Sequence, residues 1–574
     1  MNRLDVKLLR RLLGLAFPYW RSEEKAKAWG YLTLLGLLLA GYTWSGVQFN
    51  QYSGEFTSAL AAGDSGRFWR AIRVFSLLLV VAVPIYSFYY YVRDRLSILW
   101  RRWLTDRVLR NYFANRSFYR LVSMPEIDNP DQRIAEDIST FTSQSLNYLL
   151  LFASATFELL AFSKVLWEIS RPLVFFLLLY AGVGTLVTIG YFSGRMISLY
   201  FARLRREADF RFGMIRIREN AESIALYHGE DQERGQVLRR FGGVYRNFID
   251  LISWGLRLNL FSYAYSLITL ALPSIIIAPR VLSGELEVGR VVQAAGAFSA
   301  ILAALNVFVT NLEYLSRFAA GVERLDTFVR TLDHEPAGTV GKNRIITRIG
   351  DDLRFEKLTL QTPGYERTLV KDLSLDVEPA QGLMIIGPSG CGKSSLLRAV
   401  AGLWDAGSGS LVRPRLEDML FLPQHAYMIL GTLRGQLLYP KLHRKVSDEE
   451  LQEVLEHVRL PHLVERCCGL DADLDFEKIL SVGERQRLAF ARVLLHRPRF
   501  VLLDEATSAL DQENESALYG LLMTMSATVV SVSHHSSLLR FHQQILELDG
   551  DGRWRMLPAA HYRMQSGNGD SFDA

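Results

Sequence analysis

A glycine-rich segment between 383 and 397 holds the first residues that could handle phosphate. It contains the spacing Gly387-x-x-x-x-Gly392-Lys393-Ser394, between an apolar run and a helix-like sequence. Such glycines let backbone N–H groups converge on phosphate oxygens, and the following helix adds the positive end of its dipole. We expect Lys393 to reach the β- and γ-phosphates and Ser394 to bind Mg²⁺. The predicted nucleotide contacts here are Gly387, Pro388, Ser389, Gly390, Cys391, Gly392, Lys393, Ser394 and Ser395.

A pair of carboxylates follows a second apolar run, Phe500-Val-Leu-Leu. Four consecutive apolar residues are typical of a buried strand in a parallel sheet, and Asp504 and Glu505 come directly after it. Asp504 can hold Mg²⁺ through water, and Glu505 can polarise an attacking water as a general base. Together with the phosphate loop, the two acids predict hydrolysis of a bound nucleotide.

A third segment, Leu480-Ser-Val-Gly-Glu-Arg-Gln-Arg487, leads into a helix at 488–496. Its first residues are expected at the helix N-terminus, where backbone N–H groups bind anions. The segment resembles the signature loop of ATP-binding cassette (ABC) proteins, LSGGQ followed by a basic helix. Val482 replaces the first glycine of that pattern. The resemblance implies ATP contacts from Ser481, Gly483 and Glu484, the last standing where the pattern has glutamine.

The remaining ABC elements follow in the family's order. Gln424 lies in a stretch similar to the Q-loop, which links Mg²⁺ and water to the membrane domain. Ser508-Ala-Leu-Asp511 resembles the D-loop, which passes between two nucleotide domains. His534 resembles the switch histidine that contacts the γ-phosphate, with His535 as second choice. The resemblance implies catalytic roles for Gln424, Glu505 and His534, and Mg²⁺ binding by Ser394, Gln424 and Asp504.

The aromatic side chain that stacks on adenine in this family has no obvious counterpart. Thr362 stands about where that residue is expected, and Tyr365 is the nearest aromatic candidate. We therefore include Tyr365 among the predicted ATP contacts.

Six long apolar segments in the first half of the chain must position these elements at a membrane. About 20 apolar residues are needed for a helix to cross the roughly 30 Å hydrocarbon core of a bilayer. Buried helices of soluble proteins seldom stay apolar for so long. The predicted spans are Trp29–Phe49, Val74–Val92, Leu149–Leu166, Pro172–Phe192, Leu260–Pro279 and Val291–Asn311.

Positive charges gather in alternate connections between the spans. The segment before the first span and the long connections after the second and fourth are rich in arginine, whereas the other three are short and carry far fewer positive residues. By the positive-inside rule, the N-terminus, the long loops and the second half of the chain face the cytoplasm. The first apolar run is too long and begins too late for a cleavable signal peptide. We expect a multi-pass protein of a bacterial inner membrane whose long loops are helical.

The composition of the 574 residues excludes several other classes of protein. The formal net charge of +5 is too small to indicate a nucleic-acid partner. Cys391, Cys467 and Cys468 have neither disulfide nor zinc spacing. The predicted fold is an α-helical six-span transmembrane domain, like that of ABC exporters, fused to an α/β P-loop nucleotide-binding domain. The predicted parts are a transmembrane domain at 1–335, a linker at 336–348, a nucleotide domain at 349–560 and a disordered tail at 561–574.

Two loop stretches resemble one branch of the family. Asn129-Pro-Asp-Gln and the following Glu136-Asp137 are similar to the NPDQ…ED stretch of subfamily D transporters and their bacterial SbmA/BacA-like relatives. The stretch 220–229 is similar to their EAA-like motif. In ABC proteins the signature loop of one domain faces the P-loop of another. The resemblance therefore implies a homodimer with two equivalent ATP sites, moved between two states by ATP binding and hydrolysis.

The cargo is predicted from the polar residues of the spans. Glu158 and Lys164 are the intramembrane charges, and spans five and six add polar side chains such as Tyr265 and Gln293. Lys164 is expected to reach the interface, while Glu158 lines a cavity or joins two helices. The spans contain no basic cluster for an acyl-CoA phosphate tail. The resemblance thus favours bulky hydrophilic cargo, cobalamin or peptides; very-long-chain fatty acyl-CoA or lipid transport is the alternative, and an ATP-gated channel or regulator is the alternative from another class.

Overall fold

The computed structural model describes residues 6–122, 127, 129–333 and 344–562. The chain divides into two compact units, Met1–Ala337 and Gly338–Ala574. The boundary falls inside the predicted linker, but the nucleotide unit already has a strand from Ile346, three residues before the predicted start of that domain. The predicted tail lies, from residue 563 on, outside the described residues.

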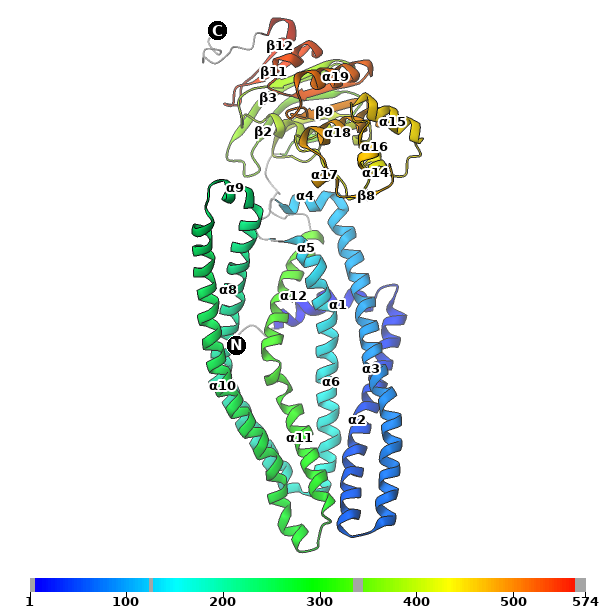
Figure 1. Ribbon diagram of the computed structural model, residues 1–574, viewed down its shortest axis with the longest axis vertical. Coiled ribbons are helices and arrows are strands. Elements are labelled where there is room, and N and C mark those ends of the chain that lie inside the picture. The colour runs from blue at the N-terminus through cyan, green and yellow to red at the C-terminus, as the bar shows by residue number, and fades with distance from the viewer. Residues whose placement is uncertain (1–5, 123–126, 128, 334–343, 563–574) are drawn as a thin grey trace. The chain divides into compact units, whose positions relative to one another are not determined.

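The membrane unit is helical throughout its described part (Figure 1). Six helical segments of the described chain are long and apolar enough to cross a membrane, which confirms the predicted spans. The two long loops are helical extensions of these spans, as predicted. The helices are α1 Val6–Trp20, α2 Lys25–Ala61, α3 Ser65–Phe113, α4 Ser117–Val122, α5 Pro130–Gln132, α6 Ile138–Ile169, α7 Arg171–Val187, α8 Gly194–Glu219, α9 Ala221–Leu226, α10 Glu230–Leu282, α11 Gly289–Thr310 and α12 Leu312–Asp333, with π-helical turns at Arg133–Asp137 and Thr188–Ser193.

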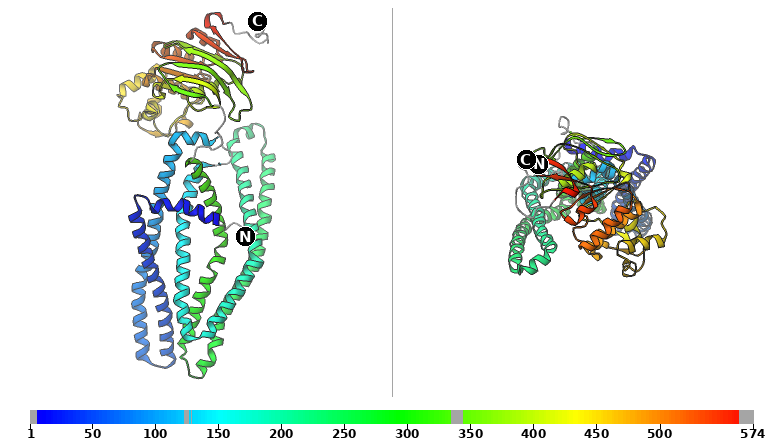
Figure 2. Two further views of the ribbon diagram at one scale, coloured as in Figure 1. Left: turned by 180° about the vertical axis from the view of Figure 1, so that it is seen from behind. Right: turned by 90° about the horizontal axis from the view of Figure 1, so that it is seen from above.

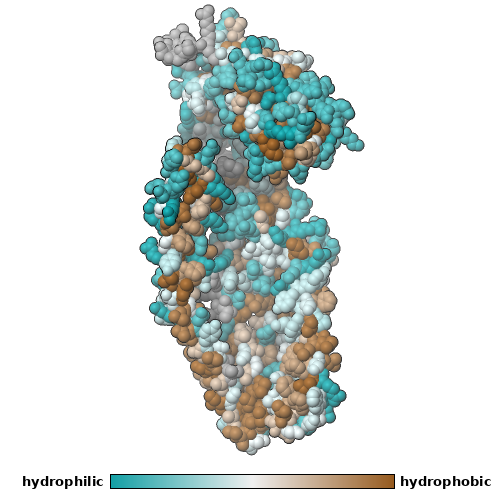
Figure 3. Space-filling view, in the orientation of Figure 1, coloured by the Kyte–Doolittle hydropathy of each residue, from teal (hydrophilic) through white to brown (hydrophobic). Residues whose placement is uncertain are grey.

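One hairpin of the membrane unit stands apart from the rest. Helices α8 and α10 run together and diverge from α6 and α12 towards α9, while their other ends join the bundle (Figures 1 and 2). At the joined end, buried apolar side chains from α6, α7, α10 and α11 form one cluster, including Leu166, Leu177, Ile277 and Phe298. Apolar side chains cover much of the outer surface there (Figure 3), as a lipid-facing surface requires.

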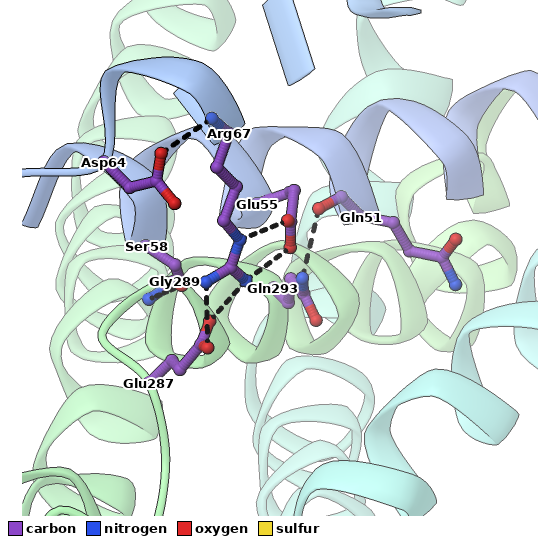
Figure 4. Close-up of polar contacts among 8 residues, drawn as sticks. All are labelled: Gln51, Glu55, Ser58, Asp64, Arg67, Glu287, Gly289 and Gln293. Carbon is purple, nitrogen blue, oxygen red and sulfur yellow. Dashed lines mark hydrogen bonds and ion pairs between the residues drawn. The ribbon is translucent and has the colours of Figure 1, made fainter. Parts of the chain in front are cut away.

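A clamp of three charged residues fastens that joined end (Figure 4). We call Glu55, Arg67 and Glu287 the end clamp. The Arg67 guanidinium donates through Nε and Nη2 to Glu55 at 2.6 and 3.0 Å, and through Nη1 and Nη2 to Glu287 at 3.0 and 2.8 Å. Hydrogen bonds from Arg67 also hold the pKa of Glu287 below its ordinary value. The clamp ties the α2–α3 turn to the α10–α11 turn.

Two glycines let α2 and α11 approach closely beside the clamp. A Cβ on Gly289 would lie 1.8 Å from the carbonyl oxygen of Gly54, and a Cβ on Gly54 would lie 2.4 Å from Cγ of Gln293. The Gly289 N–H donates to Ser58 Oγ at 3.0 Å. Lipid offers no hydrophobic drive for helices to associate, so close backbone packing of small residues and polar contacts must hold them together.

We predict that Gly54→Ala destabilises the membrane unit. The added methyl group overlaps α11, and overpacking of this kind typically costs about 1–3 kcal/mol. Gly46→Ala is the matched control on the same helix, because a Cβ there has nothing within 4 Å. Thermal unfolding in detergent should show a lower Tm for the first variant only. Equal Tm values for the two variants would contradict the close approach.

The nucleotide unit contains two main sheets and flanking helices. The six-stranded sheet has the order β12-β11-β4-β10-β9-β6, and the four-stranded sheet has the order β1-β5-β2-β3. The strands are β1 Ile346–Ile349, β2 Leu353–Gln361, β3 Thr368–Val377, β4 Gly382–Ile386, β5 Gly407–Arg413, β6 Met419–Leu422, β7 Gly431–Thr432, β8 Asp473–Leu474, β9 Phe500–Asp504, β10 Thr528–Val532, β11 Gln544–Leu548 and β12 Trp554–Pro558. The helices are α13 Lys393–Val400, α14 Leu433–Leu438, α15 Asp448–His457, α16 Leu463–Arg466, α17 Phe476–Ile479, α18 Val482–His496 and α19 Gln512–Thr524.

The six-stranded sheet positions the predicted site. Strands β4, β10, β9 and β6 are neighbours and run parallel. Their carboxyl ends therefore lie at one edge of the sheet, where ligands of open α/β sheets bind. The segments with Gly387, His534, Glu505 and Gln424 leave from these four strands in turn. A mixed α/β nucleotide domain following a six-helix membrane domain confirms the predicted fold class.

Candidate nucleotide-binding site

The loop between β4 and α13 is shaped by its glycines. Gly387 has φ +145° and Gly392 has φ +110°, a region that favours glycine. A Cβ on Gly387 would also lie 2.2 Å from the carbonyl oxygen of Leu548. The Lys393 ammonium donates to the carbonyl oxygens of Gly387 and Pro388 at 2.7 and 3.0 Å. The loop thus curls around the lysine at the start of α13, a shape that brings backbone N–H groups to a phosphate.

Ser394 and Asp504 form the pair that fits a hard cation. The Ser394 hydroxyl donates to Asp504 Oδ1 at 2.9 Å, which joins the first turn of α13 to the end of β9. Burial raises the pKa of Asp504, and the nearby Glu505 carboxylate raises it further, against the lowering effect of Ser394. Mg²⁺ prefers oxygen ligands and is held by one or two carboxylates plus substrate phosphates. These two side chains therefore fit Mg²⁺, although the described residues contain no metal-binding group of three or more His, Cys, Asp or Glu side chains.

Two other predicted catalytic residues contact the Glu505 carboxylate. Gln424 Nε2 donates to Glu505 Oε2 at 3.0 Å, and His534 Nε2 lies 3.5 Å from Glu505 Oε1. Glu505 itself has φ +48°, a strained value for a residue with a side chain, held by its N–H bond to Val532 O at 3.0 Å. The three side chains predicted to be catalytic thus meet at one carboxylate.

The signature segment begins α18 with a complete capping box. The Ser481 hydroxyl accepts from the Glu484 N–H, and the Glu484 carboxylate accepts from the Ser481 N–H at 2.8 Å. Arg466 of α16 also donates to Glu484 at 2.7 Å. Burial would raise the pKa of Glu484, but Arg466 and Ser481 outweigh it and lower the pKa to about 2. The Glu484 side chain is thus engaged within its own loop, and its predicted contact with ATP stays a prediction.

Tyr365 lies in the turn between β2 and β3. Its backbone N–H donates to the Thr362 carbonyl at 2.8 Å and its φ is +62°. The two residues considered for adenine stacking are therefore in one turn, and the stacking itself stays a prediction.

The polar residues considered for cargo have different surroundings. Tyr265 stacks on Tyr180 at 4.2 Å, and each hydroxyl donates to the other residue's carbonyl. Gln293 donates to the Gln51 carbonyl at 3.1 Å, next to the end clamp. Both residues join helices to one another. Glu158 is half-buried and accepts from Ser154 of its own helix at 3.1 Å, and its role in lining a cavity or joining two helices stays a prediction.

Several contacts that hold functional segments were missed by sequence reasoning. Asp137, the last residue of the NPDQ…ED stretch, accepts from Arg324 of α12 at 2.8 and 3.1 Å. Buried Glu515 and Gln486 contact the loops around the nucleotide site. Each of these contacts joins residues that are far apart in the chain or lie on separate elements. No local sequence motif predicts such contacts.

Comparison with known proteins defines the class of this chain. Residues 12–282 match the family model described as ABC transporter transmembrane region 2, and residues 370–508 match the one described as ABC transporter. The chain therefore belongs to the ABC transporter family. With one membrane region and one ATP-binding domain, it is a half-transporter homologous to members of subfamily D.

Three relatives illustrate this placement. The chain is 45% identical to an uncharacterized ABC transporter ATP-binding protein of Synechocystis sp., over 87% of this chain and 77% of that one. It is 35% identical to ABC transporter D family member 2, chloroplastic, of Arabidopsis thaliana, over 94% and 86%. It is 31% identical to the lysosomal cobalamin transporter ABCD4 of Homo sapiens, over 97% of each. The relatives support an ATPase coupled to transport and the subfamily D resemblance; the SbmA/BacA-like resemblance stays a prediction.

We predict that Arg466→Ala weakens the cap of α18, because it leaves the buried Glu484 carboxylate without its cation. The loss of unfolding free energy should be about 1 kcal/mol, since Arg466 is partly exposed to solvent. The folded-state pKa lies below the ordinary 4.5, so the stabilisation is present above pH 4.5 and disappears as the pH falls towards 2.

Thermal unfolding of both proteins between pH 7 and pH 3 measures this difference. The control is Arg466→Ala combined with Glu484→Gln, which removes the unpaired charge and should recover most of the loss. A difference between parent and Arg466→Ala that did not shrink at low pH would contradict the ion pair as its source.

Proposed function

We propose that this half-transporter works as a homodimer that couples ATP hydrolysis to alternating access and moves bulky hydrophilic solutes such as cobalamin or peptides. Its place is a bacterial inner membrane, with the N-terminus and the nucleotide domain in the cytoplasm. The observation that carries the proposal is the meeting of Gln424 and His534 at Glu505, beside the Ser394–Asp504 pair.

The side chains divide the chemistry among themselves. The loop of Gly387 and Lys393 binds the phosphates, and Ser394 with Asp504 would hold Mg²⁺, which neutralises phosphate charge when bound. Glu505 accepts the proton of the attacking water, because it is a carboxylate that directly follows the metal-binding Asp504 at the end of β9. Gln424 and His534 orient Glu505. The segments that carry these two residues would change position when the γ-phosphate is bound or lost.

A second copy completes the site in this proposal. In the ABC proteins that the chain resembles, the signature loop of one copy faces the phosphate loop of the other. The described chain holds one phosphate loop and one signature helix, so the signature helix that faces this phosphate loop would come from the second copy. Leu226 and Tyr227 at the end of α9 are 73% and 86% exposed. In the family that the chain resembles, the loop helices dock on a nucleotide domain, and we expect these two exposed apolar side chains to take part in that contact.

The cargo proposal rests on two observations. The human relative carries the name of a cobalamin transporter and aligns over 97% of both chains. Within the spans, Glu158 offers a hydrogen-bonding carboxylate, and no cluster of basic residues is present there to hold acyl-CoA phosphates. A polar, bulky solute matches this residue content of the spans better than an acyl-CoA does.

We predict that Glu505→Gln keeps ATP binding but slows hydrolysis by roughly a hundredfold or more, the usual effect of losing a general base. Labelled ATP should remain bound after dilution, because the closed dimer no longer opens. Lys393→Ala is the control, since it should prevent retention by weakening binding itself. Hydrolysis by Glu505→Gln at the parent rate would show that another group is the base.

Uptake into liposomes tests the cargo. We expect ATP-dependent accumulation of labelled cobalamin or a proline-rich peptide, absent in liposomes with Glu505→Gln. Accumulation of a very-long-chain acyl-CoA alone would overturn the cargo proposal in favour of lipid transport. If ATP opened a path for the solute but its concentration inside the liposomes never exceeded the concentration outside, the proposal of a pump would be wrong. That result would indicate a gated channel.

A further inference from the structure

A buried carboxylate next to the nucleotide site has no part in the chemistry described so far. Glu515 of α19 is 1% exposed. Its Oε1 accepts from the Thr507 hydroxyl and lies 2.8 Å from His535 Nδ1, and its Oε2 accepts from the Ser537 hydroxyl. Each of the three contacts measures 2.8 Å. Burying a carboxylate is costly unless it is well hydrogen-bonded, and here the donors come from separate segments.

These donors belong to the two loops that carry catalytic residues. Thr507 lies two residues after Glu505, directly before the D-loop, and is 2% exposed. His535 directly follows His534, and Ser537 follows two residues later. The loop after β9 and the loop after β10 are therefore joined at a single acid, behind the contact between Glu505 and His534.

A buried amide holds the other side of the same D-loop. Gln486 of α18 is 2% exposed, and its Oε1 accepts from the Ala509 N–H at 3.1 Å. Its Nε2 lies 3.3 Å from both the Ser508 hydroxyl and the Gln424 carbonyl. The D-loop is thus linked through Gln486 to the Q-loop and through Glu515 to the switch loop.

Packing of α19 does not require this acid. Leu518, Tyr519 and Leu522 of the same helix are each at most 3% exposed and bury it against the core. An apolar residue at 515 would serve that packing without the cost of a buried charge. The carboxylate is therefore better explained by the loops it joins than by the stability of its own helix.

We propose that Glu515 is a positioning residue that holds the D-loop and the switch loop as one unit, so that His534 and Glu505 move together with the D-loop. The proposal rests on the ATP-hydrolysing function above. Because the D-loop of the family passes between two nucleotide domains, the same linkage makes each site sensitive to the other. Loss of Glu515 should then reduce turnover and cooperativity in ATP while leaving nucleotide affinity intact.

The test compares Glu515→Ala with Glu515→Gln in the full-length protein in liposomes. Alanine removes both acceptor oxygens, and kcat should fall roughly five- to a hundredfold with the KM for ATP unchanged. Glutamine keeps one oxygen for Thr507 and His535, so kcat should recover at least in part. Glu513→Gln is the matched control, because Glu513 lies on the same helix but is exposed and forms an ion pair with Arg459.

Thr507→Val and Thr507→Ser test the same contact from its other side, in case the Glu515 variants do not fold. Valine keeps the shape and removes the hydroxyl, so it should lower kcat and the Hill coefficient, while serine should restore both. A lower Tm with parent values of kcat and Hill coefficient at a permissive temperature would overturn the proposal and make Glu515 a stabilising residue only. Absence of ATPase in the parent protein would instead refute the proposed function.

Discussion

Parallel strands that end at one edge of a sheet are the constraint on which this half-transporter depends. Strands β4, β10, β9 and β6 are adjacent, so three spacings of about 4.8 Å separate the outermost two, roughly 15 Å in all. Four chemically different segments must share that width. The phosphate loop with Ser394, the Asp504–Glu505 pair, Gln424 and His534 therefore become neighbours, although these four segments are far apart in the chain. The same crowding buries polar side chains, which is why Glu515 and Gln486 need so many partners.

The arrangement of helices in the membrane unit depends on interactions other than apolar burial. Its helices face lipid with apolar side chains, so apolar burial cannot select one arrangement of helices over another. Selection comes instead from contacts that only one arrangement permits. Gly54 and Gly289 bring two backbones together, and the forked contacts of Arg67 reach one carboxylate on α2 and another in the α10–α11 turn at once. Both devices are specific in shape and depend little on the amount of buried surface.

The sequence was sufficient for features that repeat a local pattern. Apolar length predicted the six spans, and glycine spacing together with apolar runs predicted the phosphate loop and the strand before Asp504. The ion pair of Glu484 with Arg466 was not predictable, because Arg466 is 18 residues away on another helix. Nor were the packing roles of Tyr265 and Gln293, whose partners lie on other spans. A polar residue in an apolar helix looks the same in a sequence whether it faces a solute or a neighbouring helix.

The end clamp has a mechanical consequence for the hairpin of α8 and α10. The hairpin is fastened at the end where α10 meets α11 and free of the bundle towards α9 (Figure 1). Helix α10 has 53 residues, which corresponds to a rod about 80 Å long. A rod of that length, turning by about 10° at its fastened end, carries its tip through roughly 14 Å. That displacement at the far end of α10 is wider than a helix. The clamp is the fulcrum of a lever whose long arm ends in the exposed apolar tip.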